Sequence, residues 1–214
     1  MNLNLENKIY GLIGKNGVGK TTFLKTISML QSEIQGDIII NNIKSNDIDY
    51  LDLDIIFIGD NPVFFNNLTM QEQMLLVAQL QNIKKEECKR LIDEMTEYFK
   101  VKKYLNYYPN ACSRGTLQRF TIISGYLTST TNLLLDEPFI TLDPLQVRLL
   151  EKFIINQGEE KTTIISSHDL ESLKNVCDEY LIINNNTINS YSKDEINKQD
   201  ILKLLGESYD ESFN

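Results

Sequence analysis

The chain alternates short apolar runs with longer stretches in which apolar residues recur every three or four positions. The runs lie at 9–13, 54–58, 132–135, 162–165 and 180–183. Continuous apolar runs of this length are typical of strands buried on both faces, and the periodic stretches between them predict helices. Alternation of buried strand and helix favours the α/β class, with a largely parallel sheet covered on both faces. We also expect shorter strands at 2–6 and 37–40.

One stretch, from Thr69 to about Phe99, has helical spacing and no strand pattern. Thr69 and Glu72 have the spacing of a capping box, which predicts that a helix begins there. A second helix is expected from about Lys84, with Cys88, Leu91, Ile92, Met95 and Phe99 on its inner side. We therefore predict a helical insertion that stands beside the sheet of a single domain.

The apolar run 9–13 leads directly into a glycine-rich loop that precedes a helical pattern. The loop consists of Gly14, Lys15, Asn16, Gly17, Val18, Gly19, Lys20, Thr21 and Thr22. Strand, G-x-x-x-x-G-K-[ST] loop and helix form the context in which this motif binds a nucleoside triphosphate. Its glycines let successive backbone N–H groups point at one anion, and the helix N-terminus faces the same place. Lys20 would then reach the β- and γ-phosphates, and the Thr21 hydroxyl would bind Mg²⁺.

Two further groups of polar residues follow buried strands. Asp136 and Glu137 end the run 132–135, and His168 follows the run 162–165. A carboxylate at Asp136 is suited to Mg²⁺ opposite Thr21, while Glu137 on the other side would polarise an attacking water. The alternatives are an acidic turn that closes a strand and a structural histidine. The phosphate loop upstream, and the place of His168 at a strand's C-terminal end, favour the catalytic interpretation.

These motifs, in this order and over nearly the whole length, resemble the ATPase subunit of an ATP-binding cassette (ABC) transporter. The loop resembles the Walker A motif, and the strand that ends at Asp136 resembles Walker B, with Glu137 at the catalytic glutamate and His168 at the switch histidine. The stretch 139–143, with Asp143, resembles the D-loop, and 112–116 resembles the family signature.

The resemblance implies a fold and a set of partners. The fold is a RecA-like P-loop NTPase core at about 1–68 and 117–214, a helical subdomain at about 69–116, and a reduced N-terminal antiparallel β-subdomain. The ligands are ATP and Mg²⁺, and the partners are an integral membrane permease and a second ATPase subunit, either another copy or a different chain. Within that dimer, Ser113 and Gly115 would contact the ATP of the other subunit in trans. An N-capping serine on a helix N-terminus is physically suited to an anion.

Three features depart from the family pattern. Asp60 stands where a glutamine usually contacts Mg²⁺, so its role as a metal ligand is open. Arg114 and Thr116 replace Gly and Gln in the signature, and Arg114 would either add a cation near the phosphates or be solvated. The family's adenine-stacking aromatic has no counterpart before the loop, so we expect looser binding of adenine.

Composition narrows the choice of partners. A net charge of −9 argues against nucleic acid as a partner. No apolar run reaches the ~18 residues needed to span a bilayer, so any membrane link would run through a partner at the cytoplasmic face. Three widely spaced cysteines predict small buried side chains of a reducing compartment, and not a disulfide frame or a zinc site.

The resemblance implies an ATPase that powers a separate permease. The short helical block and the Ser113-Arg114-Gly115 form of the signature are most similar to bacterial exporters, so we expect the export direction. One alternative is a soluble ABC ATPase that acts on ribosomes or DNA, which basic patches or long coiled insertions would favour. Another is a degenerate cassette that binds nucleotide without turnover. The N-K-x-D sequence at 197–200 matches a guanine-reading motif, but it follows no buried strand, so we attribute the match to chance.

Overall fold

The structure, a computed structural model, describes residues 3–31, 36–44, 47, 54–128, 130–157, 161–184, 187–196 and 198–205. Its centre is a six-stranded sheet in the order β4-β5-β6-β1-β7-β8. The strands are β1 Ile9–Ile13, β4 Ile55–Ile58, β5 Asn132–Asp136, β6 Thr162–Ser166, β7 Glu179–Asn184 and β8 Thr187–Ser192. All neighbours are parallel except β7 and β8, which form an antiparallel pair. The predicted α/β fold with a mostly parallel sheet is confirmed.

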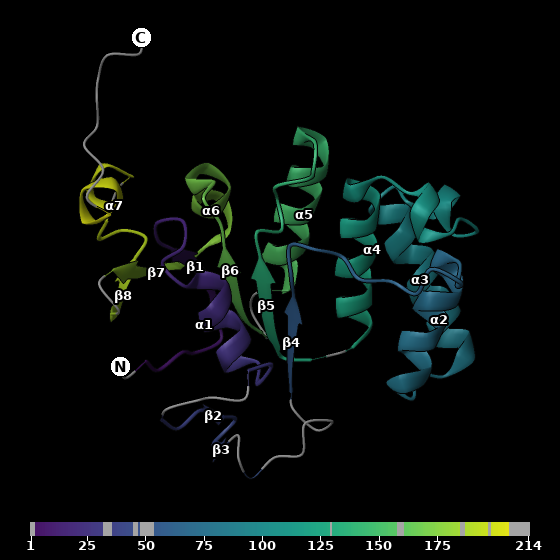
Figure 1. Ribbon diagram of the computed structural model, residues 1–214, viewed down its shortest axis with the longest axis horizontal. Helices are drawn as coiled ribbons and strands as arrows, with labels where there is room; N and C mark the ends of the chain where they lie inside the picture. The colour runs from purple at the N-terminus through teal and green to yellow at the C-terminus, as the bar shows by residue number, and fades with distance from the viewer. Residues whose placement is uncertain are drawn as a thin grey trace.

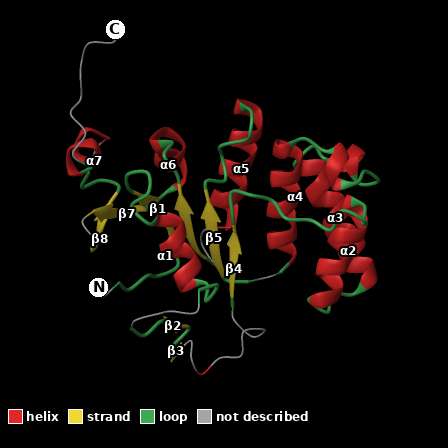
Figure 2. Ribbon diagram, in the orientation of Figure 1, coloured by secondary structure: helices red, strands yellow, loops and turns green. Residues whose placement is uncertain are grey.

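Helices cover both faces of this sheet (Figure 2). The helices of the described residues, whether on a face or beside the sheet, are α1 Lys20–Ile27, α2 Met70–Leu80, α3 Lys85–Tyr98, α4 Arg114–Leu127, α5 Pro144–Gln157, α6 Leu170–Val176 and α7 Lys198–Leu204, with 3₁₀ turns η3 Lys102–Tyr104 and η4 Pro109–Ala111. Alternate residues of each strand serve opposite faces. Tyr10 and Leu12 pack with Leu24 of α1, whereas Ile9 and Ile13 belong to the larger core formed with α4, α5 and α6.

The helical block of α2, α3 and the start of α4 stands beside the β4 edge of the sheet (Figure 1). The predicted capping box begins α2: Thr69 Oγ1 accepts the N–H of Glu72, and Glu72 Oε2 accepts the N–H of Thr69 at 2.7 Å. Helix α4 joins the block to the sheet. A Cβ at Gly125 would lie only 2.5 Å from Ile58 Cδ1, so a glycine is needed for this close approach of α4 to β4.

Two of the shorter predicted strands differ from the structure. Residues 3–6 of the stretch 2–6 form no strand; residue 2 lies outside the described part. Leu3 and Leu5 still pack on the α1 face, so their alternation reflects burial without strand pairing. Of the stretch 37–40, only β2 (Ile39–Ile40) is a strand, and it pairs with β3 (Ile43–Lys44) in a separate hairpin. Asn41 and Asn42 both have positive φ, as the two-residue turn of such a hairpin requires.

The cysteine prediction holds for Cys88 and Cys177, which are buried and free, but Cys112 is only partly buried. Burial raises the pKa of all three thiols. Within the described ranges, no helix is long and apolar enough to cross a membrane. The division into a core at about 1–68 and 117–214 and a helical subdomain at about 69–116 stays a prediction; α4 spans its second boundary.

Candidate ATP-binding and hydrolysis site

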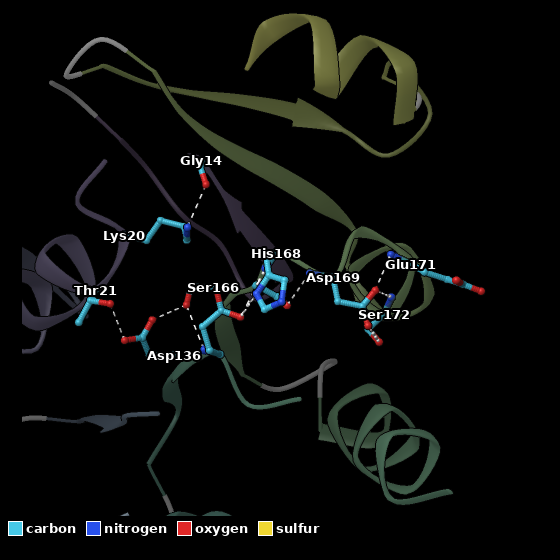
Figure 3. A network of polar contacts seen from close by, with 11 residues as sticks. Gly14, Lys20, Thr21, Asp136, Ser166, His168, Asp169, Glu171 and Ser172 are labelled. Atoms are coloured by element: carbon cyan, nitrogen blue, oxygen red, sulfur yellow. Dashed lines mark hydrogen bonds and ion pairs between the residues drawn. The ribbon is translucent and has the colours of Figure 1, made fainter. Parts of the chain in front are cut away.

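The phosphate loop turns between the central strand β1 and helix α1. Gly17 and Gly19 have φ of 78° and 107°, a conformation that other residues rarely adopt. A Cβ at Gly14 would meet the side chain of Val18 at 2.7 Å. Glycine at these positions therefore favours this loop conformation. Lys20 at its end is 8% exposed, and its Nζ donates to the Gly14 carbonyl at 2.9 Å (Figure 3).

Asp136 meets Thr21 across the edge of the sheet. Thr21 Oγ1 donates to Asp136 Oδ2 at 2.7 Å, and Ser166 Oγ donates to Asp136 Oδ1 (Figure 3). The parallel order of β5, β6 and β1 carries the ends of these strands to one edge, which explains the meeting of residues so distant in sequence. Asp136 is 2% exposed. A hydroxyl and a buried carboxylate side by side are hard oxygen donors of the kind that suits Mg²⁺ with its waters and phosphates.

Glu137 faces away from Asp136 and pairs with His168. Its Oε2 lies 2.9 Å from His168 Nδ1 and accepts the His168 N–H at 3.4 Å. Its own N–H donates to Ser166, at 3.0 Å to the carbonyl oxygen and at 3.1 Å to Oγ. Glu137 has a φ of 48°, uncommon for a residue with a side chain. The two adjacent carboxylates thus have different side-chain partners, Thr21 and Ser166 for Asp136 and His168 for Glu137.

His168 is placed by the start of α6. Asp169 caps this helix: its Oδ1 accepts the N–H groups of Glu171 and Ser172, and its Oδ2 accepts the Ser172 hydroxyl. Burial on its own would raise the pKa of Asp169, but the hydrogen bonds from Ser172 and Glu171 outweigh it and lower the pKa. The cap fixes the chain direction immediately after His168, whose side chain remains 60% exposed.

Ser113 and Gly115 lie at the start of α4. Ser113 is the N-cap: its Oγ accepts the N–H of Thr116 at 3.2 Å and shares a hydrogen bond with Thr116 Oγ1. A Cβ at Gly115 would lie 2.6 Å from the Thr141 carbonyl oxygen, so this glycine packs against the stretch 139–143. In the described part of the chain, no hydrogen bond or ion pair joins Ser113 or Gly115 to the phosphate loop.

The remaining predicted residues have local partners. Asp143 caps α5, since its Oδ1 accepts the N–H of Gln146 at 2.9 Å. Asp60 follows β4, and its Oδ1 accepts from Asn61 Nδ2 at 3.0 Å. No contact between described residues joins Asp60 to Thr21 or Asp136, so its metal role stays a prediction. The N-K-x-D match at 197–200 is described only in part. Residue 197 lies outside the described part, and residues 198–200 form the start of α7.

The sequence interpretation missed two supporting residues, Ser166 and Asp169. Ser166 is the last residue of β6, and Asp169 closes the polar sequence Ser166-Ser167-His168-Asp169 that begins there. The available signal was a run of polar residues at the end of a buried strand. The partner of Ser166, Asp136, became evident only from the pairing of β5 with β6. Asp169 instead caps α6 locally, and its place directly before the helical stretch that begins at Leu170 was a signal for this cap.

A family model described as ABC transporter matches residues 1–140. The chain belongs to the ABC transporter family. The predicted nucleotide-binding subunit of an ABC transporter is thereby confirmed, and ATP is the nucleotide that the family binds and hydrolyses.

Curated relatives agree. EcsA of Bacillus subtilis, an ABC-type transporter ATP-binding protein, is 29% identical over 184 residues, which cover 85% of this chain and 74% of EcsA. The uncharacterised ABC transporter ATP-binding protein MJ1023 of Methanocaldococcus jannaschii is 32% identical over 191 residues, 89% of this chain and 69% of that protein. The osmoprotectant import ATP-binding protein OsmV of Salmonella typhimurium is 32% identical over 182 residues, but the match spans only 48% of OsmV and 81% of this chain.

Solved structures confirm the P-loop fold of the family. The ATP-binding subunit of an ABC transporter superposes with a TM-score of 0.82 and 28% identity, covering 96% of this chain and 86% of the other. A dimeric structure of the ATP-binding cassette MJ0796 in a post-hydrolysis state, bound to ADP and Pi, superposes with a TM-score of 0.73 and 23% identity over 90% of this chain and 88% of the other.

Proposed function

We propose that this ABC subunit hydrolyses ATP with Mg²⁺ and so powers a separate membrane permease. One observation carries the proposal: Thr21, Asp136 and Ser166 form one hydrogen-bonded network, directly beside the pair of Glu137 and His168 (Figure 3). A metal-binding pair and a water-activating pair at the mouth of a phosphate loop are the parts that phosphoryl transfer to water needs.

Each group has a role in this proposal. Backbone N–H groups of 14–22 hold the phosphates, and Lys20 exchanges its bond to the Gly14 carbonyl for the β- and γ-phosphate oxygens. Thr21 and Asp136 would hold Mg²⁺, and the ion would supply positive charge that offsets the negative charge of the phosphates. Glu137 orients and deprotonates the attacking water, and His168 holds the Glu137 carboxylate in place.

The hydrolytic site would be completed by a second subunit, either another copy or a different ATPase chain. Ser113 and Gly115 have no bond to their own phosphate loop, and the α4 N-terminus beside them is suited to an anion. We infer that they contact the γ-phosphate of ATP held by the partner, with Asp143 near the same interface. The dimeric state of MJ0796 is a precedent in a protein of the same fold.

The permease would contact the helical block and the turn at Asp60, which places the subunit at the cytoplasmic face of the membrane. The names of the relatives favour a transporter over a soluble ATPase acting on ribosomes or DNA. The network at Asp136 is intact, which speaks against a cassette without turnover. Export remains our prediction of direction, although OsmV is named as an import protein.

The test compares Glu137→Gln and Lys20→Ala with the parent chain. Glu137→Gln is expected to bind ATP, to lose at least about a hundred-fold in phosphate release, and to form an ATP-dependent dimer by light scattering. Lys20→Ala is expected to lose nucleotide binding. Co-purification with a polytopic membrane protein, and vesicle transport of its substrate, test coupling and direction. A Glu137→Gln chain that stays monomeric in saturating ATP and Mg²⁺, with its membrane partner present, would contradict the proposal.

A further inference from the structure

One guanidinium group ties the turn after β4 to the first residue of α4. Arg114 Nη2 donates to the Asp60 carbonyl at 3.3 Å and to Asn61 Oδ1 at 3.2 Å. Asn61 Nδ2 in turn donates to Asp60 Oδ1 at 3.0 Å. A continuous chain of hydrogen bonds therefore runs from α4 to the carboxylate of Asp60.

The chemistry of these groups determines which atom donates and which accepts in each hydrogen bond of the network. A guanidinium group is only a donor, so Arg114 must face the amide oxygen of Asn61. The amide nitrogen then points the other way, toward the Asp60 carboxylate, which is only an acceptor when ionised. A flipped amide would set donor against donor and acceptor against acceptor. Arg114 thus determines how Asn61 orients Asp60.

The two ends of this hydrogen-bond network, Asp60 and Arg114, lie next to residues of the proposed reaction. In the pairing of β4 with β5, Ile58 is opposite Leu135, so Asp60 and Glu137 each lie two positions beyond this pair at the same edge of the sheet. Arg114 directly follows Ser113, the residue that we assign to the partner's ATP. Where the family pattern has neutral Gln and Gly, this chain has Asp60 and Arg114, and the two substitutions meet in one network.

We propose that Arg114 is a positioning residue, which orients the Asp60 carboxylate through Asn61. The same hydrogen bonds attach the turn after β4 to α4 and so restrict the motion of the turn. The functional part of this inference rests on the proposed ATPase. Because all three side chains are exposed or half-buried, these bonds contribute little to the free energy of unfolding. Their loss should therefore alter the turn and the reaction and leave the fold unchanged.

The first experiment measures the order of the turn without any nucleotide. The chain has no tryptophan, and Val63, just beyond the turn, is 89% exposed, so Val63→Trp supplies a single fluorescent reporter. In this background Arg114→Met should increase the amplitude of fast anisotropy decay, while Arg114→Lys, which keeps a charged donor, should stay close to the parent. Arg90→Met is the matched control, since Arg90 pairs only with Glu94 on α3 among the described residues.

The second experiment measures steady-state ATP hydrolysis of the same chains. Arg114→Met is expected to lower kcat roughly three- to ten-fold with little change in KM for ATP, because the phosphate loop is untouched. Arg114→Lys should restore most of the rate, and Arg90→Met should have no effect. Unchanged tryptophan mobility in Arg114→Met, or a lysine variant as impaired as the methionine variant, would overturn the inference. A parent chain without ATPase activity would contradict the proposed function, and the anisotropy comparison would still decide the role of Arg114.

Discussion

At the scale of residues, the site depends on the separation of two neighbouring carboxylates. Asp136 accepts the Thr21 hydroxyl, whereas Glu137 Oε2 lies 2.9 Å from His168 Nδ1. Ser166 supports both, because its hydroxyl donates to Asp136 and accepts the N–H of Glu137. One serine thereby keeps the metal-facing and water-facing groups in a fixed relation.

The cap of α6 predicts a defined dependence of stability on pH. Asp169→Ala is expected to cost about 1 kcal/mol of unfolding free energy at pH 7, because it leaves helix N–H groups without an acceptor. Folding lowers the pKa of Asp169. Its contribution to the free energy of unfolding is therefore fully present at pH values above the ordinary pKa of 3.8, and it is lost as the pH falls through the lower pKa of the folded state. The difference in unfolding free energy between the parent and Asp169→Ala, measured by urea titration, should therefore narrow below about pH 4.

Asp169→Asn is the matched control, since asparagine caps helices about as well and does not titrate. The difference in unfolding free energy between Asp169→Asn and Asp169→Ala should therefore stay constant in this window, while that between the parent and Asp169→Ala narrows. A gap between parent and Asp169→Ala that is constant from pH 7 to pH 3 would contradict the role given to the carboxylate.

The sequence was sufficient to find the residues of the site whose chemistry is tied to a motif, such as Lys20 and Asp136. It did not show which groups hold them. Ser166 and the contact of Arg114 with Asp60 depend on which strands and helices are neighbours, and that is set by packing of distant segments. For the same reason, the sequence alone does not decide whether Arg114 contacts a phosphate or is solvated.

At the scale of elements, the apolar runs of the central sheet were predictive, and the two segments outside that sheet were not. The five buried runs and the capping box of α2 appear in the structure close to their predicted places, because burial on two faces leaves a strong pattern. Residues 3–6 alternate in the same way as a strand but have no partner, and pairing cannot be inferred from alternation in one segment. The sheet order also required the three-dimensional structure.

The contact of α4 with β4 gives a prediction at this scale. Gly125→Ala is expected to destabilise the protein by about 1–3 kcal/mol, although alanine favours helices, because the new methyl group would overlap Ile58 Cδ1. Ile58→Val removes that atom, so the double variant Gly125→Ala/Ile58→Val should be less destabilised than the sum of the two single variants. Additive losses in chemical denaturation would show that this overlap is not the cause.

At the scale of the whole molecule, the central issue is whether the hydrolytic site is divided between two chains. Ser113→Asp is a suitable probe, because aspartate keeps the N-cap of α4 but sets a negative charge against a phosphate. Ser113→Asn, a neutral cap, serves as its control and should retain more activity.

Mixing two inactive variants tests the division directly. Lys20→Ala lacks the phosphate-loop half of each site, and Ser113→Asp lacks the α4 half. If the halves come from different chains, a mixed dimer has one complete site, so a mixture should recover up to about a quarter of the parent's ATPase rate. If both halves come from one chain, the mixture stays as inactive as its components, and the proposed arrangement is wrong.

Strand β4 has a single neighbour in the described sheet, whereas β1 is held between β6 and β7. Hydrogen bonds therefore hold the strand before the phosphate loop on both sides and the strand before Asp60 on one side only, and we expect the second strand to deform more easily. Under the proposed function, a permease that pulls on the helical block would disturb the border at β4 before it disturbs the phosphate loop.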